Sequence, residues 1–65
     1  MSIEINDVVR LIDNQPSDGL LSGALGVVVA VFSEPREAYE VEFCDEDGCT
    51  IAQLALLPSQ FEVLK

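Results

Sequence analysis

The 65-residue sequence contains no histidine and no tryptophan, only two cysteines and only three lysine or arginine residues. Without histidine, proton transfer near neutral pH would need a carboxyl, thiol or amine group with a strongly shifted pKa, and no pattern in the sequence marks one. Two thiols without histidine also leave a four-ligand zinc site incomplete within one chain. We therefore expect a protein that is not an enzyme and that has no catalytic residue, no cofactor and no metal.

Basic residues are too few to favour nucleic acid as a partner. Arg10, Arg36 and Lys65 stand against twelve Asp and Glu residues, which gives a net charge of −9. This charge repels phosphate backbones and anionic lipid headgroups. It attracts a basic protein, but it also keeps a small domain soluble, and charge alone does not separate these two roles. We expect an unidentified protein partner and no membrane, with nucleic acid disfavoured as a partner and the oligomeric state left open.

Long apolar segments are also missing. The longest uncharged apolar stretch runs from Ala24 to Phe32, well short of the roughly 20 residues that a membrane-spanning helix requires. The sequence shows no cationic segment followed by an apolar run and a cleavage site, so no signal peptide is expected. These absences predict a cytoplasmic protein, in which Cys44 and Cys49 would stay reduced.

What the sequence does contain is enough apolar surface for one core. Hydrophobic residues make up 49% of the chain, with four Gly and three Pro. A chain of this length can bury about 60% of its unfolded surface, which suffices for one small domain over residues 1–65. Since aromatic residues are few, Val, Leu and Ile must fill the core, and the β-branched ones among them favour strands.

The first half of the chain predicts two strands and a long loop. Alternation followed by an apolar run from Ile3 to Ile12 predicts the first strand. Asp13–Gly19 is rich in turn-forming residues and predicts a loop. Leu20–Leu21 interrupt its polarity, so we expect them to fold back onto the core. Gly23 and Gly26 are expected to bracket a tight entry to the second strand.

The second strand and the hairpin that follows have distinct patterns. Val27–Phe32 is apolar at both alternating sets of positions, which predicts a strand covered on both faces or one that bends between two packed sheets. Ser33–Glu37 is a polar turn. The alternation from Tyr39 to Phe43 predicts a strand with one buried face and one acidic face. Asp45–Gly48 then predicts a hairpin loop.

The C-terminal part completes the fold. Thr50–Leu57 predicts a central strand, a strand partly exposed to a partner, or a short helix. Pro58–Gln60 predicts one tight helical turn, and Phe61–Leu64 a closing strand. The order of loop lengths predicts an all-β fold, a small five-stranded SH3-like barrel with a short helical turn before the last strand.

Four segments carry a resemblance to a known family: Asp7–Leu11, Gly23–Val29, Ala38–Phe43 and Asp47–Thr50. Together they resemble a family of small stand-alone bacterial proteins of about this length, described as a domain of unknown function. The resemblance covers nearly the whole chain. Because its motifs are turn glycines and core positions, it implies a fold and no activity.

Gly23–Val29 alone is similar to the glycine-and-valine motif of ribosomal and transcription-factor SH3-like domains, which contact RNA or proteins. The loops of those domains are usually rich in Lys and Arg, whereas the loops here carry Asp13, Asp18 and other acidic residues. A second likeness is to the SH3-like subunits that dock ferredoxin on photosynthetic complexes, which would need a basic face. The sequence shows no such face.

The hairpin loop and the two cysteines have simple interpretations. Asp45–Gly48 is faintly similar to the start of a calcium loop, but the twelfth position, which needs a bidentate Glu, is Leu56. We expect a solvated hairpin tip. Cys44 and Cys49 flank this tip and could face each other across the hairpin. We expect inert thiols, with a redox-sensitive pair and a metal site as alternatives.

Seven carboxylates between the second strand and the hairpin tip form the predicted partner-binding surface. They are Glu34, Glu37, Glu40, Glu42, Asp45, Glu46 and Asp47. Only Arg36 lies among them, whereas a surface adapted only to solubility would mix charges of both signs. The alternative is that outward strand positions are charged because they face water.

The leading hypothesis is a non-catalytic protein-interaction module that presents this acidic hairpin to a basic protein, as an antitoxin-like or inhibitor-like protein or an accessory subunit. One alternative is an SH3-like domain that binds nucleic acid through its glycine loop. Another is a self-associating structural protein, which rests on the apolar run Ile51–Leu57.

Concentrated negative charge predicts a salt effect on stability. Carboxylates that repel one another in the folded state are screened by moderate salt, since the Debye length is about 8 Å at an ionic strength of about 0.15 M. We predict that the melting temperature, followed by circular dichroism, rises between low and moderate salt. A melting temperature that salt leaves unchanged or lowers would contradict the concentration of charge.

Overall fold

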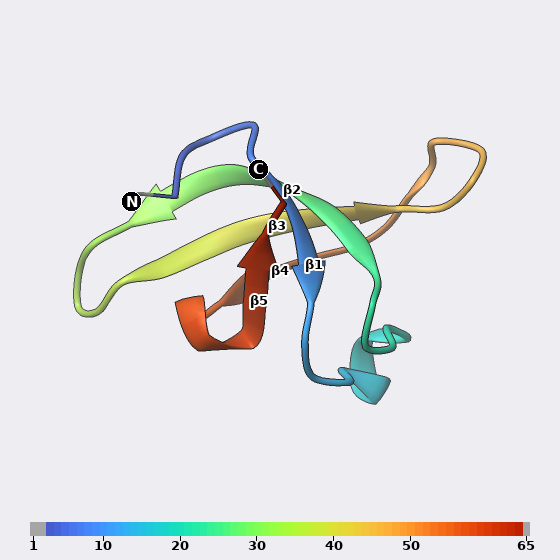
Figure 1. Cartoon of the computed structure of the whole chain (residues 1–65), viewed down its shortest axis with the longest axis horizontal. Coiled ribbons are helices and arrows are strands. Elements are labelled where there is room, and N and C mark those ends of the chain that lie inside the picture. The colour runs from blue at the N-terminus through green and yellow to red at the C-terminus, as the bar shows by residue number, and fades with distance from the viewer. Residues whose placement is uncertain (1–2, 65) are drawn as a thin grey trace.

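The computed structural model describes residues 3–64 and consists of strands and short turns of 3₁₀ helix (Figure 1). The strands are β1 (Val8–Leu11), β2 (Leu25–Phe32), β3 (Ala38–Cys44), β4 (Thr50–Leu56) and β5 (Phe61–Val63). The two 3₁₀ turns are η1 (Pro16–Asp18) and η2 (Pro58–Gln60). Over residues 3–64, no helix has the length and apolar character needed to cross a membrane.

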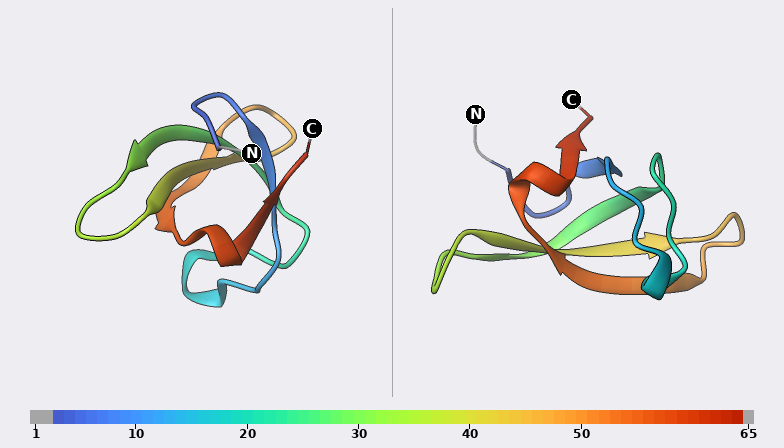
Figure 2. Two further views of the ribbon diagram at one scale, coloured as in Figure 1. Left: turned by 60° about the vertical axis from the view of Figure 1, so that its left-hand side comes forward. Right: turned by 90° about the horizontal axis from the view of Figure 1, so that it is seen from below.

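All five strands are antiparallel and lie in one sheet of order β4-β3-β2-β1-β5. Strands β2, β3 and β4 form a long twisted ribbon, and β1 and β5 run across it (Figures 1 and 2). The single turn η2 leads directly into β5, and the side-chain Oε1 of Gln60 accepts a hydrogen bond of 2.7 Å from the N–H of Leu57. This is the predicted small five-stranded SH3-like barrel.

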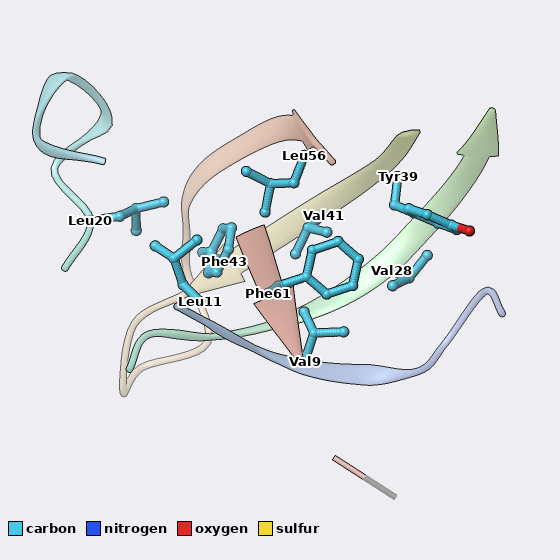
Figure 3. Close-up of a cluster of buried hydrophobic side chains, with 9 residues drawn as sticks. All are labelled: Val9, Leu11, Leu20, Val28, Tyr39, Val41, Phe43, Leu56 and Phe61. Carbon is cyan, nitrogen blue, oxygen red and sulfur yellow. The ribbon is translucent and has the colours of Figure 1, made fainter. Parts of the chain in front are cut away.

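The core lies inside the fold of the sheet and contains aliphatic and aromatic side chains from all five strands and the first loop (Figure 3). Its buried members are Val9, Leu11, Leu20, Val28, Tyr39, Val41, Phe43, Leu56 and Phe61. The rings of Tyr39 and Phe61 meet edge to face, with centroids 5.7 Å apart and an interplanar angle of 81°. This geometry is favourable for aromatic pairs, so the ring of β5 is held over the β3–β4 ribbon.

The first strand begins later than predicted. In place of a strand from Ile3, the chain makes a turn, and β1 starts only at Val8. A carboxylate oxygen of Asp7 accepts a hydrogen bond of 2.8 Å from the N–H of Glu4, and Asn6 adopts a φ of 78°. Because the Asp7 side chain takes the place of a backbone partner, the alternating Ile residues there do not continue the ladder.

A β-bulge in β2 explains why Val27–Phe32 is apolar at both alternating sets of positions. Val28 lies opposite Val41, but Ala30 lies opposite Glu40, so one extra residue sits in β2. The bulge bends the strand and exchanges its two faces, as one of the two predicted alternatives required. The other alternative, cover on both faces, is wrong: 45% of Val31 and 44% of Phe32 remain exposed.

Strand β4 lies at the edge of the sheet and pairs only with β3. Of the three alternatives for Thr50–Leu57, the central strand and the helix are therefore wrong, and the partly exposed strand is confirmed. The loop before β2 also differs in part from expectation. Leu20 folds back and is buried, as predicted, but Leu21 is exposed.

One glycine sets how closely β2 approaches β3. A Cβ atom at Gly26 would lie 2.7 Å from Cγ1 of Val41 and 3.0 Å from both Cδ1 of Phe43 and the backbone oxygen of Glu42. Real Cβ atoms do not come as close as 2.7 Å, so a side chain at this position forces Val41 to shift and crowds the backbone of β3 at Glu42. At Gly48, by contrast, the space is open and only the φ of 81° favours glycine.

We predict that Gly26→Ala destabilises the protein by roughly 1–3 kcal/mol through overpacking, and that Gly26→Asn costs more. Gly48→Ala should cost about 1 kcal/mol through backbone conformation, and Gly48→Asn should cost less than Gly48→Ala because Asn tolerates a left-handed φ. Urea denaturation of the four variants measures these differences. The same rank order of Ala and Asn at both positions would contradict the steric role of Gly26.

Candidate functional site

The seven predicted site residues form a band along β3 and its two turns, not a single cluster. Two lie in the turn between β2 and β3, two point outward from β3, and three lie in the loop between β3 and β4. They are, in this order, Glu34 and Glu37, Glu40 and Glu42, and Asp45, Glu46 and Asp47. The turn and the loop lie at opposite ends of the ribbon (Figure 1), so the carboxylates run along its whole length.

Two of these carboxylates have a role inside the fold. Oδ1 of Asp45 accepts hydrogen bonds of 2.9 Å from the backbone N–H groups of Asp47 and Cys49, which closes the β3–β4 loop. The carboxylate of Glu37 accepts a hydrogen bond from the hydroxyl group of Tyr39. Bonds from a side chain to the backbone of its own loop, as at Asp45, stabilise the loop itself, and the Glu37 bond ties the β2–β3 turn to β3. A structural reason for these two carboxylates therefore exists without any partner.

The band has little counter-charge nearby. Within residues 3–64, the only salt bridge joins Arg10 on β1 to Glu62 on β5, so Arg10 is held away from the band. Arg36, in the β2–β3 turn, is the one other described cation, and its side chain is exposed. The carboxylates of Glu46 and Asp47 form no hydrogen bond or ion pair within the described chain. The band thus presents a nearly unbalanced negative charge to solvent.

The strand register shows what lies beside the band on the outer face of the sheet. Val8, Val27, Glu42 and Gln53 are direct cross-strand neighbours, and they form one row across β1, β2, β3 and β4. Direct cross-strand neighbours on one face lie close enough to interact. Val27 of β2 therefore borders Glu42 directly, and Val8 of β1 lies next to Val27, two strands from Glu42.

This border is hollowed. A shallow cavity of about 230 Å³ lies on this face. It is lined by Val8, Leu25, Gly26, Val27, Glu42 and Cys44. The thiol of Cys44 donates to Oε1 of Glu42 over 3.8 Å, which keeps this half-buried carboxylate at the wall of the cavity. An aliphatic chain that ends in a positive charge fits such a surface, because its stem can cover apolar atoms while its head meets the carboxylate.

Sequence reasoning found Glu42 but missed the apolar part of this site. The pattern of Val27–Phe32 predicted a strand covered on both faces or one that bends between two packed sheets. In the structure 36% of Val27 is exposed, and Val8 and Leu25 are also exposed. The available signal was that no helix or further strand in the sequence could cover the outer face of a five-stranded barrel. Only the register shows that Val27 lies beside Glu42 and that Val8 lies next to Val27.

The cysteines and the loop carboxylates do not form a described metal site. Cys44 and Cys49 are both free and exposed, and Cys44 pairs in the ladder with Thr50. Among residues 3–64, no three His, Cys, Asp or Glu side chains gather closely enough to hold a metal ion. The loop that is faintly similar to a calcium loop uses Asp45 to bind its own backbone.

Comparison with known proteins gives one result. A protein family described as a domain of unknown function (DUF4926) matches residues 5–63. No curated protein and no solved structure is significantly similar to the chain.

The bond between Tyr39 and Glu37 has a measurable consequence. The hydrogen bond to the Glu37 carboxylate raises the pKa of Tyr39 above its ordinary value of 10.0, and burial and the negative charge of Glu37 add to this shift. Because the pKa is raised in the folded state, the stabilisation is fully present below pH 10.0. It is lost as the pH rises through the raised pKa of the folded protein.

We predict that Glu37→Gln lowers the pKa of Tyr39 towards 10.0. The chain has one tyrosine and no tryptophan, so the ultraviolet absorbance of tyrosinate reports on this residue alone. Glu34→Gln, which removes a carboxylate of the same turn that does not bind Tyr39, is the control. Circular dichroism at each pH shows that the protein is still folded. Equal titration curves for the wild type and Glu37→Gln would refute the role of this bond.

Proposed function

The chain belongs to the family described as a domain of unknown function (DUF4926), and since that description states no activity, we propose a function from the surface of the protein. The protein is a non-catalytic interaction module. Its acidic outer face binds a basic segment of another protein, in the manner of an antitoxin-like or inhibitor-like protein or an accessory subunit. The free, exposed Cys44 and Cys49 are consistent with action in the cytoplasm, where thiols stay reduced.

The observation that carries this proposal is the cavity between the apolar row and Glu42. An exposed ion pair alone contributes only about 0–1 kcal/mol, so the band of carboxylates would not by itself hold a partner firmly. A lysine or arginine whose stem covers Val8 and Val27 adds apolar burial to the charge contact with Glu42. Both contributions are available at the same place on the outer face.

The exposed apolar residues also argue against a role in solubility alone. Val8, Leu25 and Val27 lie together on one face, where Arg10, the cross-strand partner of Leu25, borders them and is paired with Glu62. A surface adapted only to solubility has few contiguous apolar side chains and mixes charges of both signs. This face has apolar side chains beside carboxylates, as partner-binding surfaces often do.

Nucleic acid is a weaker candidate on the same observations. Phosphate binding needs several exposed Lys or Arg side chains. Of the cations in residues 3–64, Arg10 is paired with Glu62, and Arg36 lies in a turn with Glu34 and Glu37. The field around this surface repels phosphate.

The test uses a capped lysine-rich peptide and backbone amide NMR spectra of the protein. We predict that the peptide shifts the amide signals of Val8, Val27 and Cys44. We predict that Glu42→Gln weakens binding about tenfold, equivalent to ~1.4 kcal/mol. Glu34→Gln removes the same charge from the far turn and should weaken binding less than about threefold, as expected for an exposed pair.

A glutamate-rich peptide of the same length is the control for non-specific contacts, and it should not shift these signals. Equal losses for Glu42→Gln and Glu34→Gln would mean that only net charge matters. That result, or unshifted outer-face signals, would overturn the proposed site.

A further inference from the structure

The two edges of the sheet are not alike. β5, at one edge, has only three residues and carries the charged Glu62 at its centre. β4, at the other edge, has seven residues, Thr50–Leu56, and contains no charged residue and no proline. Short length, charge, proline and β-bulges are the usual means by which proteins prevent an edge strand from pairing with another chain. β5 is short and charged, whereas β4 has only a register shift at its start, between its pairs with Cys44 and Phe43. From Ala52 to Leu56 its pairing is regular, and it has no charge and no proline.

Hydrogen bonds at Val28 determine which backbone groups of β4 are free. The N–H of Val28 donates to the backbone oxygen of Asp7 over 3.0 Å, and its oxygen accepts from the N–H of Asn6 over 2.8 Å. Both polar groups of Val28 thus point away from β3. In an antiparallel pair the bonded and non-bonded positions alternate, so Val28 and Val41 form a non-bonded pair.

The alternation of hydrogen-bonded and non-bonded residue pairs continues from β3 to β4. Since the backbone groups of Val41 point away from β2, they point to β4 and bond with Leu54, their partner in the register. The N–H and C=O groups of Gln53 and Ala55 then point away from β3, toward the free edge. No hydrogen bond from these backbone groups to a turn or loop is present in the described chain. They form a row of donors and acceptors without a strand beside them.

The side chains of β4 leave this edge accessible. Ile51 is 53% exposed, and Gln53 and Ala55 on the outer face are also exposed. Ala52 and Leu54 contact the core from the inner face but remain only partly buried. In Figure 2 no further strand lies beyond β4. An added strand could therefore form backbone bonds and also bury apolar side chains on the inner face.

We propose that β4 binds an extended basic segment of a partner protein as a sixth strand of the sheet. This inference rests on the proposed function, since the acidic outer face determines the occupant. Recognition by an added strand takes affinity from backbone hydrogen bonds and specificity from alternate side chains. The segment that fits has apolar residues toward Ala52 and Leu54, alternating with lysine or arginine on the outer face.

The register supports a basic occupant. On the outer face Gln53 lies opposite Glu42, and Ala55 lies opposite Glu40. Neighbouring strands are about 4.8 Å apart, so an added strand lies about 10 Å from β3, within reach of a lysine or arginine side chain that meets a glutamate. Ala55 is small, but the side-chain amide of Gln53 donates to Oε2 of Glu40 over 3.4 Å, so a basic residue of the added strand must replace this long hydrogen bond to reach Glu40. At the end of β4 the unpaired carboxylates of Glu46 and Asp47 add to the attraction.

A second copy of this chain fits the edge less well. It would bring together two molecules that each carry a net charge of −9. Its own β4 contains no basic residue to meet Glu40 or Glu42. Like charges across an interface disfavour the complex, so charge selects a basic partner over self-pairing.

The experiment uses a capped peptide of the same length as β4 that alternates lysine and valine. Amide hydrogen exchange is measured by NMR for the free protein and for the complex. We expect the amides of Gln53 and Ala55 to exchange rapidly in the free protein and to slow at least about tenfold on binding, as for a newly formed backbone bond. The amide of Leu54, already bonded to β3, should change little.

Two probes separate backbone pairing from charge attraction. One version of the peptide is N-methylated at its odd-numbered residues and another at its even-numbered residues. Each version keeps every charge but loses the N–H donors on one of its two edges. One of these two N-methylated peptides should bind at least about tenfold more weakly than the unmodified peptide, as expected for the loss of two backbone bonds, and the other should not. Gln53→Pro removes a free-edge N–H without a bond to β3, and it should have the same effect. Gln53→Ala is its control: it keeps the N–H and, like Gln53→Pro, loses the side-chain amide that donates to Oε2 of Glu40.

If Gln53→Pro fails to fold, Ala55→Lys tests the same edge by placing a positive charge in the path to Glu40. It should weaken binding of the basic peptide at least about fivefold, or ~1 kcal/mol. Its circular dichroism spectrum and melting temperature show that the fold is retained.

The outcomes distinguish this inference from the proposed function. In one outcome, Glu42→Gln weakens binding, but neither pattern of N-methylation nor the β4 variants change it. That result would overturn strand addition but not the proposed acidic interaction module. No binding of any basic peptide would overturn both. A dimer in light scattering that Gln53→Pro dissociates would show that the edge takes a second copy, and it would overturn the basic occupant.

Discussion

The close approach of β2 to β3 at Gly26 is the constraint on which the rest of the barrel depends. Because Gly26 has no side chain, Val41 and Phe43 of β3 can fill the space beneath β2. The same approach places Val27 beside Glu42 on the opposite face. One missing Cβ therefore helps to form both the packed core and the hollow on the outer surface.

The bulge in β2 determines which of its side chains lie on each face of the sheet. A regular strand would keep Val27 and Val31 on one face, but the extra residue turns Val31 to the side of Tyr39, while Val27 stays on the side of Glu42. The bulge also increases the twist of the ribbon, which allows β1 and β5 to cross it and close the core. Since 65 residues provide no further layer, apolar side chains on the outer face stay uncovered.

Charge and apolar exposure act together in this protein. Carboxylates extend along β3 from one turn to the next, while β4 beside them carries no charge at all. A neutral edge next to an acidic band favours a basic strand and disfavours a second copy, because attraction and repulsion act at the same register positions. Asp45 and Glu37 have structural roles in this band, so its carboxylates are not equivalent.

Composition and alternation by themselves determined the fold class, the hairpin loop, the helical turn at Pro58–Gln60 and the acidity of β3, because these depend on local patterns of polarity and on turn residues. Only the tertiary structure decided that β1 begins at Val8, that β4 lies at an edge, and that Val27 lies between Val8 and Glu42. Strand order, register and bulges result from pairing between distant segments. A single strand's pattern does not contain its neighbours, and these neighbours decide which side chains form a site.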